Sequence, residues 1–220
     1  MANQQAQWTP ETLMETMRGF QAACVIGAAL QLDIFGTLAG GGKTAKQVAR
    51  GIKGKLRGTE PLLNALAALG LLRKNKDTFT LTPFAKKHLA PDSPHYMGWG
   101  AMHAAHLMNA WNHIPETVRT GEPAPRPPRD SEAGRTRHKN FIMAMHNYSR
   151  ERSRVIVNSL DLKGVDAILD VGGGPGTYAF AFADTLPDAH ITIFDTPPTC
   201  AIARDNIAQH GYADRVDTEE

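Results

Sequence analysis

The feature that most constrains the fold is a glycine-rich segment in the last quarter of the chain, at residues 172–176. The apolar run 167–171 before it predicts a buried strand, and 177–186 after it predicts a helix. A second apolar run, 190–194, predicts another strand that ends at Asp195. Strand, glycine loop, helix, strand and acid in this order make up half of a nucleotide-binding α/β sheet.

The spacing of the glycines indicates which nucleotide the loop would take. A dinucleotide fingerprint has glycine at the first, third and sixth places, whereas here the glycines fall at the first, third and fifth, as Gly172, Gly174 and Gly176. No lysine follows in the manner of a triphosphate-binding loop, and Asp170 stands two places before the first glycine. This pattern is typical of enzymes that use S-adenosylmethionine (SAM), a cationic cofactor with an amino group. Asp195 lies where the hydroxyls of a ribose would sit.

The first ninety residues follow the pattern of a winged helix. Helices are expected over 11–31, 45–50 and 59–72, with caps at Thr44 and Thr59 and extended pieces around 79 and 81. The helix at 11–31 is apolar around most of its circumference, so it must be buried nearly everywhere. Another subunit or an ordinary core could cover it.

Charge is distributed unevenly along the chain. Residues 43–90 hold eleven Lys and Arg against two Asp and Glu, whereas residues 161–220 hold three against eleven. A basic winged helix raises the question of DNA binding. The expected third helix, 59–72, carries no Lys or Arg to read bases. The basic run is therefore interpreted as a solvated face, and no nucleic-acid partner is expected.

The middle of the chain is helical and interrupted by prolines. Helices are expected over 95–118 and 138–160, and four prolines between 121 and 130 predict a loop that reaches about Lys139. The expected domains are a winged-helix-like domain at 1–95, a helical connector with a Pro-rich loop (121–139) at 96–163, and a Rossmann-like domain at 164–220.

Other features limit location and partners. The longest apolar run is nine residues, too short to span a bilayer, and the first residues are polar. Two cysteines provide no disulfide framework. A cytoplasmic protein without a membrane partner is expected.

The segments Asp170–Gly176 and Phe194–Pro197 resemble those of SAM-dependent O-methyltransferases of the plant caffeate and acetylserotonin type, which include bacterial natural-product enzymes. Trp111 also fits that family's pattern, as do Phe141, Met145 and Ser149. The winged-helix-like start is similar to the family's dimerisation domain, so the resemblance covers nearly the whole chain and implies a homodimer. The fold class expected is α/β, with that helical domain followed by the first part of a Rossmann-like methyltransferase domain.

The resemblance also implies a function and a set of site residues. The function is methyl transfer from SAM to a hydroxyl of a small aromatic molecule. Plain core packing is the alternative for each apolar position. The implied cofactor-binding residues are Ser149, Asp170, Gly172, Gly174, Gly176 and Asp195. The implied walls of the acceptor pocket are Met102, His106, Leu107, Met108, Phe141 and Met145.

Family members continue beyond the point that corresponds to residue 220 and carry their general-base histidine there. The chain is therefore expected to be an incomplete or inactive portion that binds SAM weakly or not at all and transfers no methyl group by itself. His103, His106 and His146 are the candidates for a replacement base, and no metal site has a convincing spacing. A non-catalytic dimerisation or binding module and a winged-helix regulator remain the alternative functions.

Overall fold

The computed structural model describes residues 8–220, and this part of the chain divides after Gly98 into two compact units. The predicted three-segment division, 1–95, 96–163 and 164–220, stays a prediction. No helix among the described residues is both long and apolar enough to cross a membrane.

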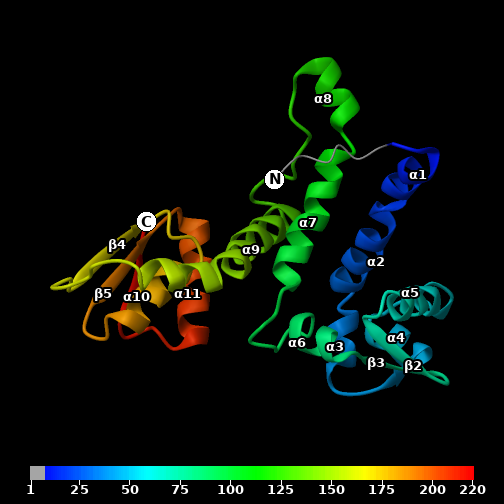
Figure 1. The fold of residues 1–220 in the computed structure, drawn as a ribbon, viewed down its shortest axis with the longest axis horizontal. Coiled ribbons are helices and arrows are strands. Elements are labelled where there is room, and N and C mark those ends of the chain that lie inside the picture. Colours follow the sequence, from blue (N-terminus) through cyan, green and yellow to red (C-terminus); the bar gives the residue numbers. More distant parts are fainter. Residues whose placement is uncertain (1–7) are drawn as a thin grey trace. The chain divides into compact units, whose positions relative to one another are not determined.

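The first unit has the predicted winged-helix-like layout of helices followed by a small antiparallel sheet (Figure 1). The sheet has the strand order β1-β3-β2. The hydrophobic core of the first unit contains Phe35 and Leu38 from α3, Leu63 and Leu66 from α5, and Phe79 from β3. The elements are α1 (Pro10–Arg18), α2 (Phe20–Gln31), α3 (Ile34–Ala39), β1 (Lys43–Thr44), α4 (Ala45–Gly51), α5 (Leu56–Ala68), β2 (Leu72–Asn75), β3 (Thr78–Leu81) and α6 (Pro83–His88).

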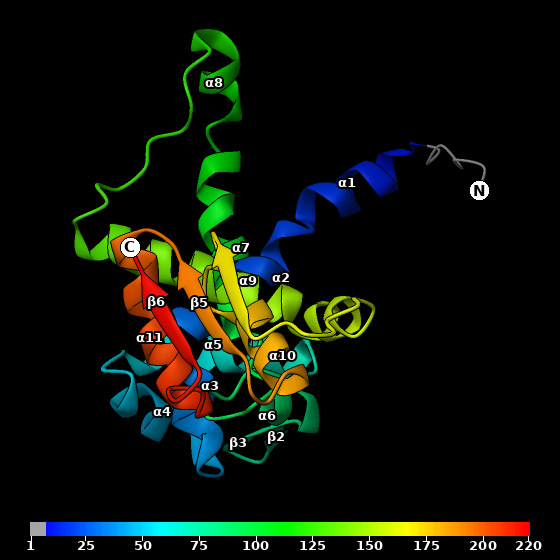
Figure 2. The same cartoon turned by 90° about the vertical axis from the view of Figure 1, so that its left-hand side faces the viewer.

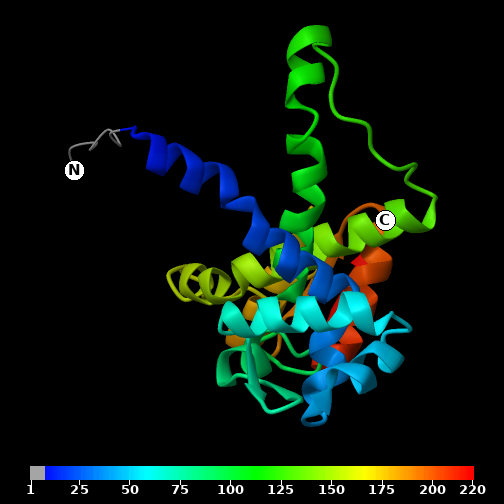
Figure 3. The same cartoon turned by 90° about the vertical axis from the view of Figure 1, so that its right-hand side faces the viewer.

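The expected single helix at 11–31 is wrong, and the ordinary core that was one of its two expected covers is not found for α1 within the described residues. The segment forms two helices, because the Gly19 N–H bonds to the Thr16 carbonyl at 3.2 Å and tightens the turn between them. No residue of α1 is buried, and Gly27 and Ala29 are the buried residues of α2. Figure 3 shows the two helices, in blue, following one another above α5, in cyan.

Caps explain where the next helices begin. Thr44 caps α4 as predicted, and its side chain accepts the N–H of Gln47. The predicted cap at Thr59 is wrong, because α5 begins at Leu56 and the Thr59 hydroxyl donates to the Lys55 carbonyl inside the helix. The earlier start adds Arg57 to a helix that was expected to carry no cation.

The wing also differs from its expected form. The helix α5 ends at Ala68, not Leu72, because Gly70 adopts φ +76° and the Leu71 N–H returns to the Leu66 carbonyl. The strand β2 therefore begins at Leu72 and pairs with β3, so Phe79 and Leu81 lie in one strand instead of two.

The second unit is a three-stranded parallel sheet with helices, as predicted for the Rossmann-like part. The strand order is β4-β5-β6, and Figure 2 shows the strands side by side with α10 and α11 behind them. The elements from the unit boundary onward are α7 (Gly98–Trp111), α8 (Ile114–Thr120), α9 (Glu132–Val157), β4 (Ala167–Val171), α10 (Thr177–Thr185), β5 (His190–Phe194), α11 (Pro197–His210) and β6 (Val216–Glu219).

Two details of this unit differ from the sequence prediction. The helix α9 begins at Glu132 and not near 138, because the Ser131 side chain caps it by accepting the Gly134 N–H at 3.0 Å. The strand β4 was expected to be buried, yet Leu169 and Val171 are 58% and 70% exposed. They lie on the face of β4 that no described helix covers, whereas Ile191 and Ile193 of β5 are fully buried against α10 and α11.

Candidate functional site

The glycine loop joins β4 to α10 at the carboxyl edge of the parallel sheet, where such sheets bind ligands. Gly172, Gly174 and Gly176 all adopt positive φ, at 71°, 57° and 82°. The Gly176 N–H bonds to the Gly173 carbonyl at 3.0 Å and closes a tight turn with Gly174 and Pro175 at its centre. L-residues with a Cβ rarely adopt these angles, so glycine is required at the three predicted positions.

Gly172 and Gly176 differ in what surrounds them. A Cβ on Gly172 would meet nothing within 4 Å, so the space over this residue is open. A Cβ on Gly176 would lie 2.8 Å from Cδ1 of Ile193 and 3.1 Å from the Phe180 ring. Gly176 therefore lets the loop pack on the core, whereas Gly172 leaves the backbone accessible to a ligand.

Asp195 contacts the loop directly from the end of β5. Its Oδ2 accepts the Gly174 N–H at 3.0 Å, and its Oδ1 accepts the Thr196 N–H at 2.6 Å. Oδ1 also accepts a bond from the Thr196 hydroxyl at 3.3 Å, so Oδ2 is the oxygen that keeps a free lone-pair direction for a further donor, such as a ribose hydroxyl. The structure thus brings together two residues that the sequence assigns to one site.

Asp170 has a carboxylate oxygen without a partner. Its Oδ2 is buried with no hydrogen bond, and a Cβ on Gly173 would lie 2.7 Å from it. Burial raises the pKa of the Asp170 carboxyl, and the nearby Asp195 raises it further. Two acids beside a glycine turn favour a cationic ligand, whose charge would stabilise the ionised carboxylates.

His146 contacts the start of α10 from the neighbouring helix α9. Its Nδ1 lies 3.0 Å from the Thr177 hydroxyl, and its ring lies 5.5 Å from that of His210. Burial, and then the positive charges of His210 and Arg150, lower the pKa of His146 to about 4. His146 is therefore neutral near pH 7, and its hydrogen bond to Thr177 makes it a support of the helix start.

The predicted acceptor-pocket residues lie on α7 and α9. These helices are joined where the Gly100 N–H donates to Asn147 Oδ1 at 3.1 Å and the Tyr148 hydroxyl donates to the Gly100 carbonyl at 3.3 Å. The pocket residues on α7 are Met102, His106, Leu107 and Met108, and those on α9 are Phe141 and Met145. Ser149 is partly exposed on α9, and its contact with a cofactor stays a prediction, as does the pocket.

Two of the histidines on α7 contact α9. The ring of His103 lies 5.2 Å from that of Phe141, and His106 Nε2 lies 2.8 Å from Asn140 Nδ2. Burial and the charge of Arg137 lower the pKa of both histidines, which favours the neutral form that can accept a proton. In residues 8–220, no three His, Cys, Asp or Glu side chains are grouped to hold a metal ion.

Asn206 and Thr196 were missed by the sequence analysis. Asn206 Nδ2 donates to the Pro175 carbonyl at 2.6 Å, and the Thr196 hydroxyl lies 3.3 Å from Asp195 Oδ1. Thr196 adjoins a predicted residue and could have been found from that position. Asn206 lies in α11, 31 residues beyond its partner, and no spacing signals the contact.

Two family models match the chain in succession. The O-methyltransferase dimerisation domain matches residues 14–91, and the O-methyltransferase domain matches residues 129–220. The two matched ranges coincide with the winged-helix-like unit and with the part of the second unit that contains the glycine loop.

Similar proteins include characterised methyltransferases. The 3-hydroxy-5-methyl-1-naphthoate 3-O-methyltransferase of Streptomyces sahachiroi is 32% identical over 95% of this chain. Acetylserotonin O-methyltransferase of Macaca mulatta is 27% identical over 89% of it. The solved structure of PigF with SAH, the demethylated product of SAM, is 26% identical and matches 96% of this chain with a TM-score of 0.77.

The chain spans 62% of the length of the Streptomyces enzyme, 61% of that of the Macaca enzyme and 66% of the PigF chain. Relatives and family models agree on one class of protein, which confirms the resemblance predicted from the glycine loop and the residues around it. This chain belongs to the family of SAM-dependent O-methyltransferases, in which an O-methyltransferase dimerisation domain precedes the methyltransferase domain.

Proposed function

We propose that the chain binds SAM at the glycine loop and serves in methyl transfer to a hydroxyl of a small aromatic molecule. The observation that carries this proposal is the unpartnered, buried Oδ2 of Asp170 beside a turn of positive-φ glycines and a second acid, Asp195. Such a site suits a ligand that has both a cationic group and ribose hydroxyls.

The residues present fit SAM in three respects. Asp170 offers a negative charge to the cationic end, Asp195 Oδ2 offers a free lone pair to the ribose, and the open face of Gly172 allows close approach. When bound, SAM supplies an electrophilic methyl group. The chain's own residues then hold the cofactor and orient it for an in-line attack, and positioning of this kind contributes most of the rate in such reactions.

The acceptor is proposed from the relatives. The Streptomyces sahachiroi enzyme is named for a hydroxynaphthoate, and TcmO of Streptomyces glaucescens, 29% identical, for an 8-O-methylation in tetracenomycin synthesis. An aromatic hydroxyl is therefore proposed here, with Met102, Leu107 and Phe141 among the pocket walls. The neutral His103 and His106 support a role as proton acceptors.

The cofactor assignment is tested by titrating the chain with SAM and SAH in a calorimeter. Asp195→Ala should weaken binding by about 1–3 kcal/mol, because hydrogen bonds to charged groups contribute that much. The matched control is Asp188→Ala, which removes the same charge from an exposed position of the same unit. Equal affinity of Asp195→Ala and the control would contradict the ribose assignment.

The reaction is tested by incubating methyl-labelled SAM with the chain and a panel of phenols, catechols and aromatic amines. Amines are included because OxyT, a relative 27% identical, is named as an N,N-dimethyltransferase. Label transferred to phenols alone would support hydroxyl methylation and would overturn the expectation that this portion transfers no methyl group by itself. Label on amines alone would contradict hydroxyl methylation.

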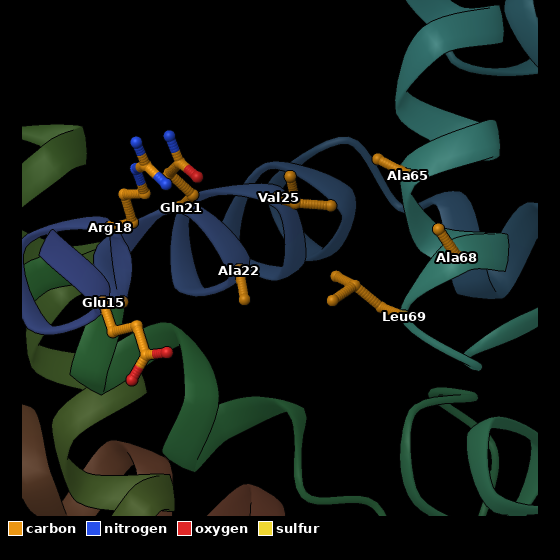
Figure 4. Close-up of a pocket in the computed structure, with 9 residues that line it drawn as sticks. Glu15, Arg18, Gln21, Ala22, Val25, Ala65, Ala68 and Leu69 are labelled. Atoms are coloured by element: carbon orange, nitrogen blue, oxygen red, sulfur yellow. The ribbon is translucent and has the colours of Figure 1, made fainter. Parts of the chain in front are cut away.

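A homodimer through α1 and α2 is the assembly that we propose. Leu13 is about half exposed, and Met17 and Phe20 are more exposed than that. A largely apolar groove of about 500 Å³ lies between α1–α2 and α5, and Figure 4 shows Ala22 and Val25 facing Leu69 across it. Together with the dimerisation-domain match, this surface supports a contact with a second copy.

Light scattering at tens of micromolar tests the assembly, since an interface of roughly nanomolar affinity would be saturated there. The wild type should have twice the mass of the chain. Cys24→Arg, at an exposed position of α2, should give a monomer, whereas Val155→Arg, at an exposed position of α9, should not. A monomeric wild type would refute the proposal.

We also propose a cytoplasmic location and no nucleic-acid partner. Cys24 and Cys200 are both free, which supports a reducing compartment. The exposed positions of α5 carry one cation, Arg57, which is too few for a helix that reads base edges.

A further inference from the structure

The central turn of the glycine loop is held from both sides by the following strand–helix unit. On one side, the Gly174 N–H donates to Asp195 at the end of β5. On the other side, the Pro175 carbonyl accepts a hydrogen bond from Asn206 Nδ2 of α11 at 2.6 Å. The peptide groups that flank the Gly174–Pro175 bond are thereby fixed in direction.

An asparagine is unusual at position 206, because the side chain is buried and only partly hydrogen-bonded. The residue is 2% exposed, and its Oδ1 is buried without a hydrogen-bond partner. A buried polar atom without a partner destabilises the fold, and a leucine of similar size would avoid that cost. The amide group is therefore explained by what its other atom does, which is to donate to Pro175.

The bond from Asn206 acts on the same turn that presents the Gly174 N–H to Asp195. The turn contains Gly174 at φ +57°, a position with access to many backbone conformations. Without the Asn206 donor, the Pro175–Gly176 peptide group can rotate, and the bond from Gly176 to Gly173 that closes the turn loosens with it. The Asp195 carboxylate would then lose its fixed direction.

We propose that Asn206 is a positioning residue of the SAM site, which orients the Gly174–Pro175 turn through the Pro175 carbonyl. The identity of the ligand in this inference rests on the proposed function, whereas the effect of Asn206 on the turn does not. Asn206 touches neither the cofactor nor the acceptor in this assignment, and it acts through the backbone of the loop.

A structural role and a positioning role predict different results for Asn206→Leu. If Asn206 only stabilises the core, its replacement changes neither the exchange of the loop amides nor the affinity of the folded chain, whatever its effect on the melting temperature. If Asn206 positions the loop, the melting temperature stays near that of the wild type, because the lost bond is offset by removal of the unpartnered Oδ1. The loop itself then becomes mobile.

The test measures the ligand-free and the ligand-bound chain. In amide hydrogen exchange without ligand, Asn206→Leu should accelerate exchange of the Gly176 N–H by about tenfold, which corresponds to one ordinary hydrogen bond. In titrations with SAH, the same variant should bind about tenfold more weakly. The control is Gln209→Leu, the same type of change at an exposed position of the same helix.

Unchanged exchange at Gly176 in Asn206→Leu would overturn the inference, whether or not the chain binds SAH. Failure of the wild type to bind SAH, with exchange accelerated in the variant, would refute the proposed function and leave the positioning of the turn supported. Equal SAH affinity of wild type and variant would overturn the link from the turn to the ligand.

A second variant tests the donor itself. Asn206→Asp keeps the size of the side chain, and its carboxyl can donate to Pro175 only when protonated. Its SAH affinity relative to the wild type at the same pH should approach unity in acid and fall as the pH rises. A ratio that does not vary with pH would contradict a role for the Asn206 N–H.

Discussion

Three glycines of the second unit have nearly the same positive φ but different surroundings. Alanine variants at the three positions therefore distinguish the effects of backbone strain, core packing and ligand contact. Gly164 has φ +76° in the turn before β4, and a Cβ there would meet nothing within 4 Å. Gly172 has φ +71° and equally open space, but lies at the proposed cofactor site. Gly176 has φ +82°, and its Cβ would press on Ile193 and Phe180.

The expected magnitudes follow from these differences. An L-residue in the left-handed region costs about 1–2 kcal/mol, so Gly164→Ala and Gly172→Ala should each destabilise the second unit by that amount. Overpacking of a core adds about 1–3 kcal/mol, so Gly176→Ala should cost about 2–5 kcal/mol in total. Gly172→Ala alone should combine the small stability cost with loss of SAM affinity.

Urea unfolding followed by circular dichroism measures the stability of each variant, and titration with SAH measures binding below the unfolding transition. A cost for Gly176→Ala no larger than that for Gly164→Ala would refute the packing of the loop on β5. If Gly172→Ala binds SAH as tightly as Gly164→Ala does, the loop backbone is not in contact with the cofactor, and the assignment of the site is wrong.

Three further predictions concern charged and titratable side chains. SAM affinity should fall as the pH drops through the raised pKa of Asp170, because the cofactor needs the ionised carboxylate, and titrations of Asp170→Asn should lack this dependence. Arg215→Ala should lower stability in urea by about 1–3 kcal/mol, since Arg215 Nη1 donates to three carbonyls at the end of α10. The pKa of His146 is lowered to about 4, mainly by burial, so the unfolded chain takes up this proton first as the pH falls. Its stabilising effect is complete above about pH 6.5 and is lost towards pH 4, by up to about 3 kcal/mol. His146→Gln should flatten the stability profile in that window, and the exposed His113→Gln should not.

The glycine loop was predictable from sequence because local chemistry determines its geometry. Positive φ at Gly172, Gly174 and Gly176 is available to few other residues, and the apolar runs on either side have the length of strands. The caps of helices at Thr44 and the acid at Asp195 follow from equally local rules. The fold class and the family were therefore accessible before any coordinates.

Errors arose where the local signal had two meanings. Thr59 followed by Pro61 is a good helix start, yet α5 begins earlier, at Leu56, and contains Pro61 in its interior, with Leu63 and Leu66 fully buried. The continuous apolar pattern of 11–31 predicted burial, whereas the covering surface for α1 is absent from the described residues of its own unit. The contact of Asn206 with Pro175 depends on tertiary packing and leaves no sequence pattern.

Several features that each destabilise a ligand-free fold occur in and around the glycine loop. Asp170 and Asn206 each have a buried oxygen without a hydrogen-bond partner. The loop glycines lose more conformational entropy on folding than other residues do. Side chains that cost stability and lie together mark a site shaped by its ligand rather than by the core. A cation at Asp170 would pair the orphaned oxygen and lower the raised pKa of its carboxyl, so binding and local stability are coupled. At the proposed SAM site, the residues that make the free loop unfavourable would thus be the ones that a bound cation stabilises.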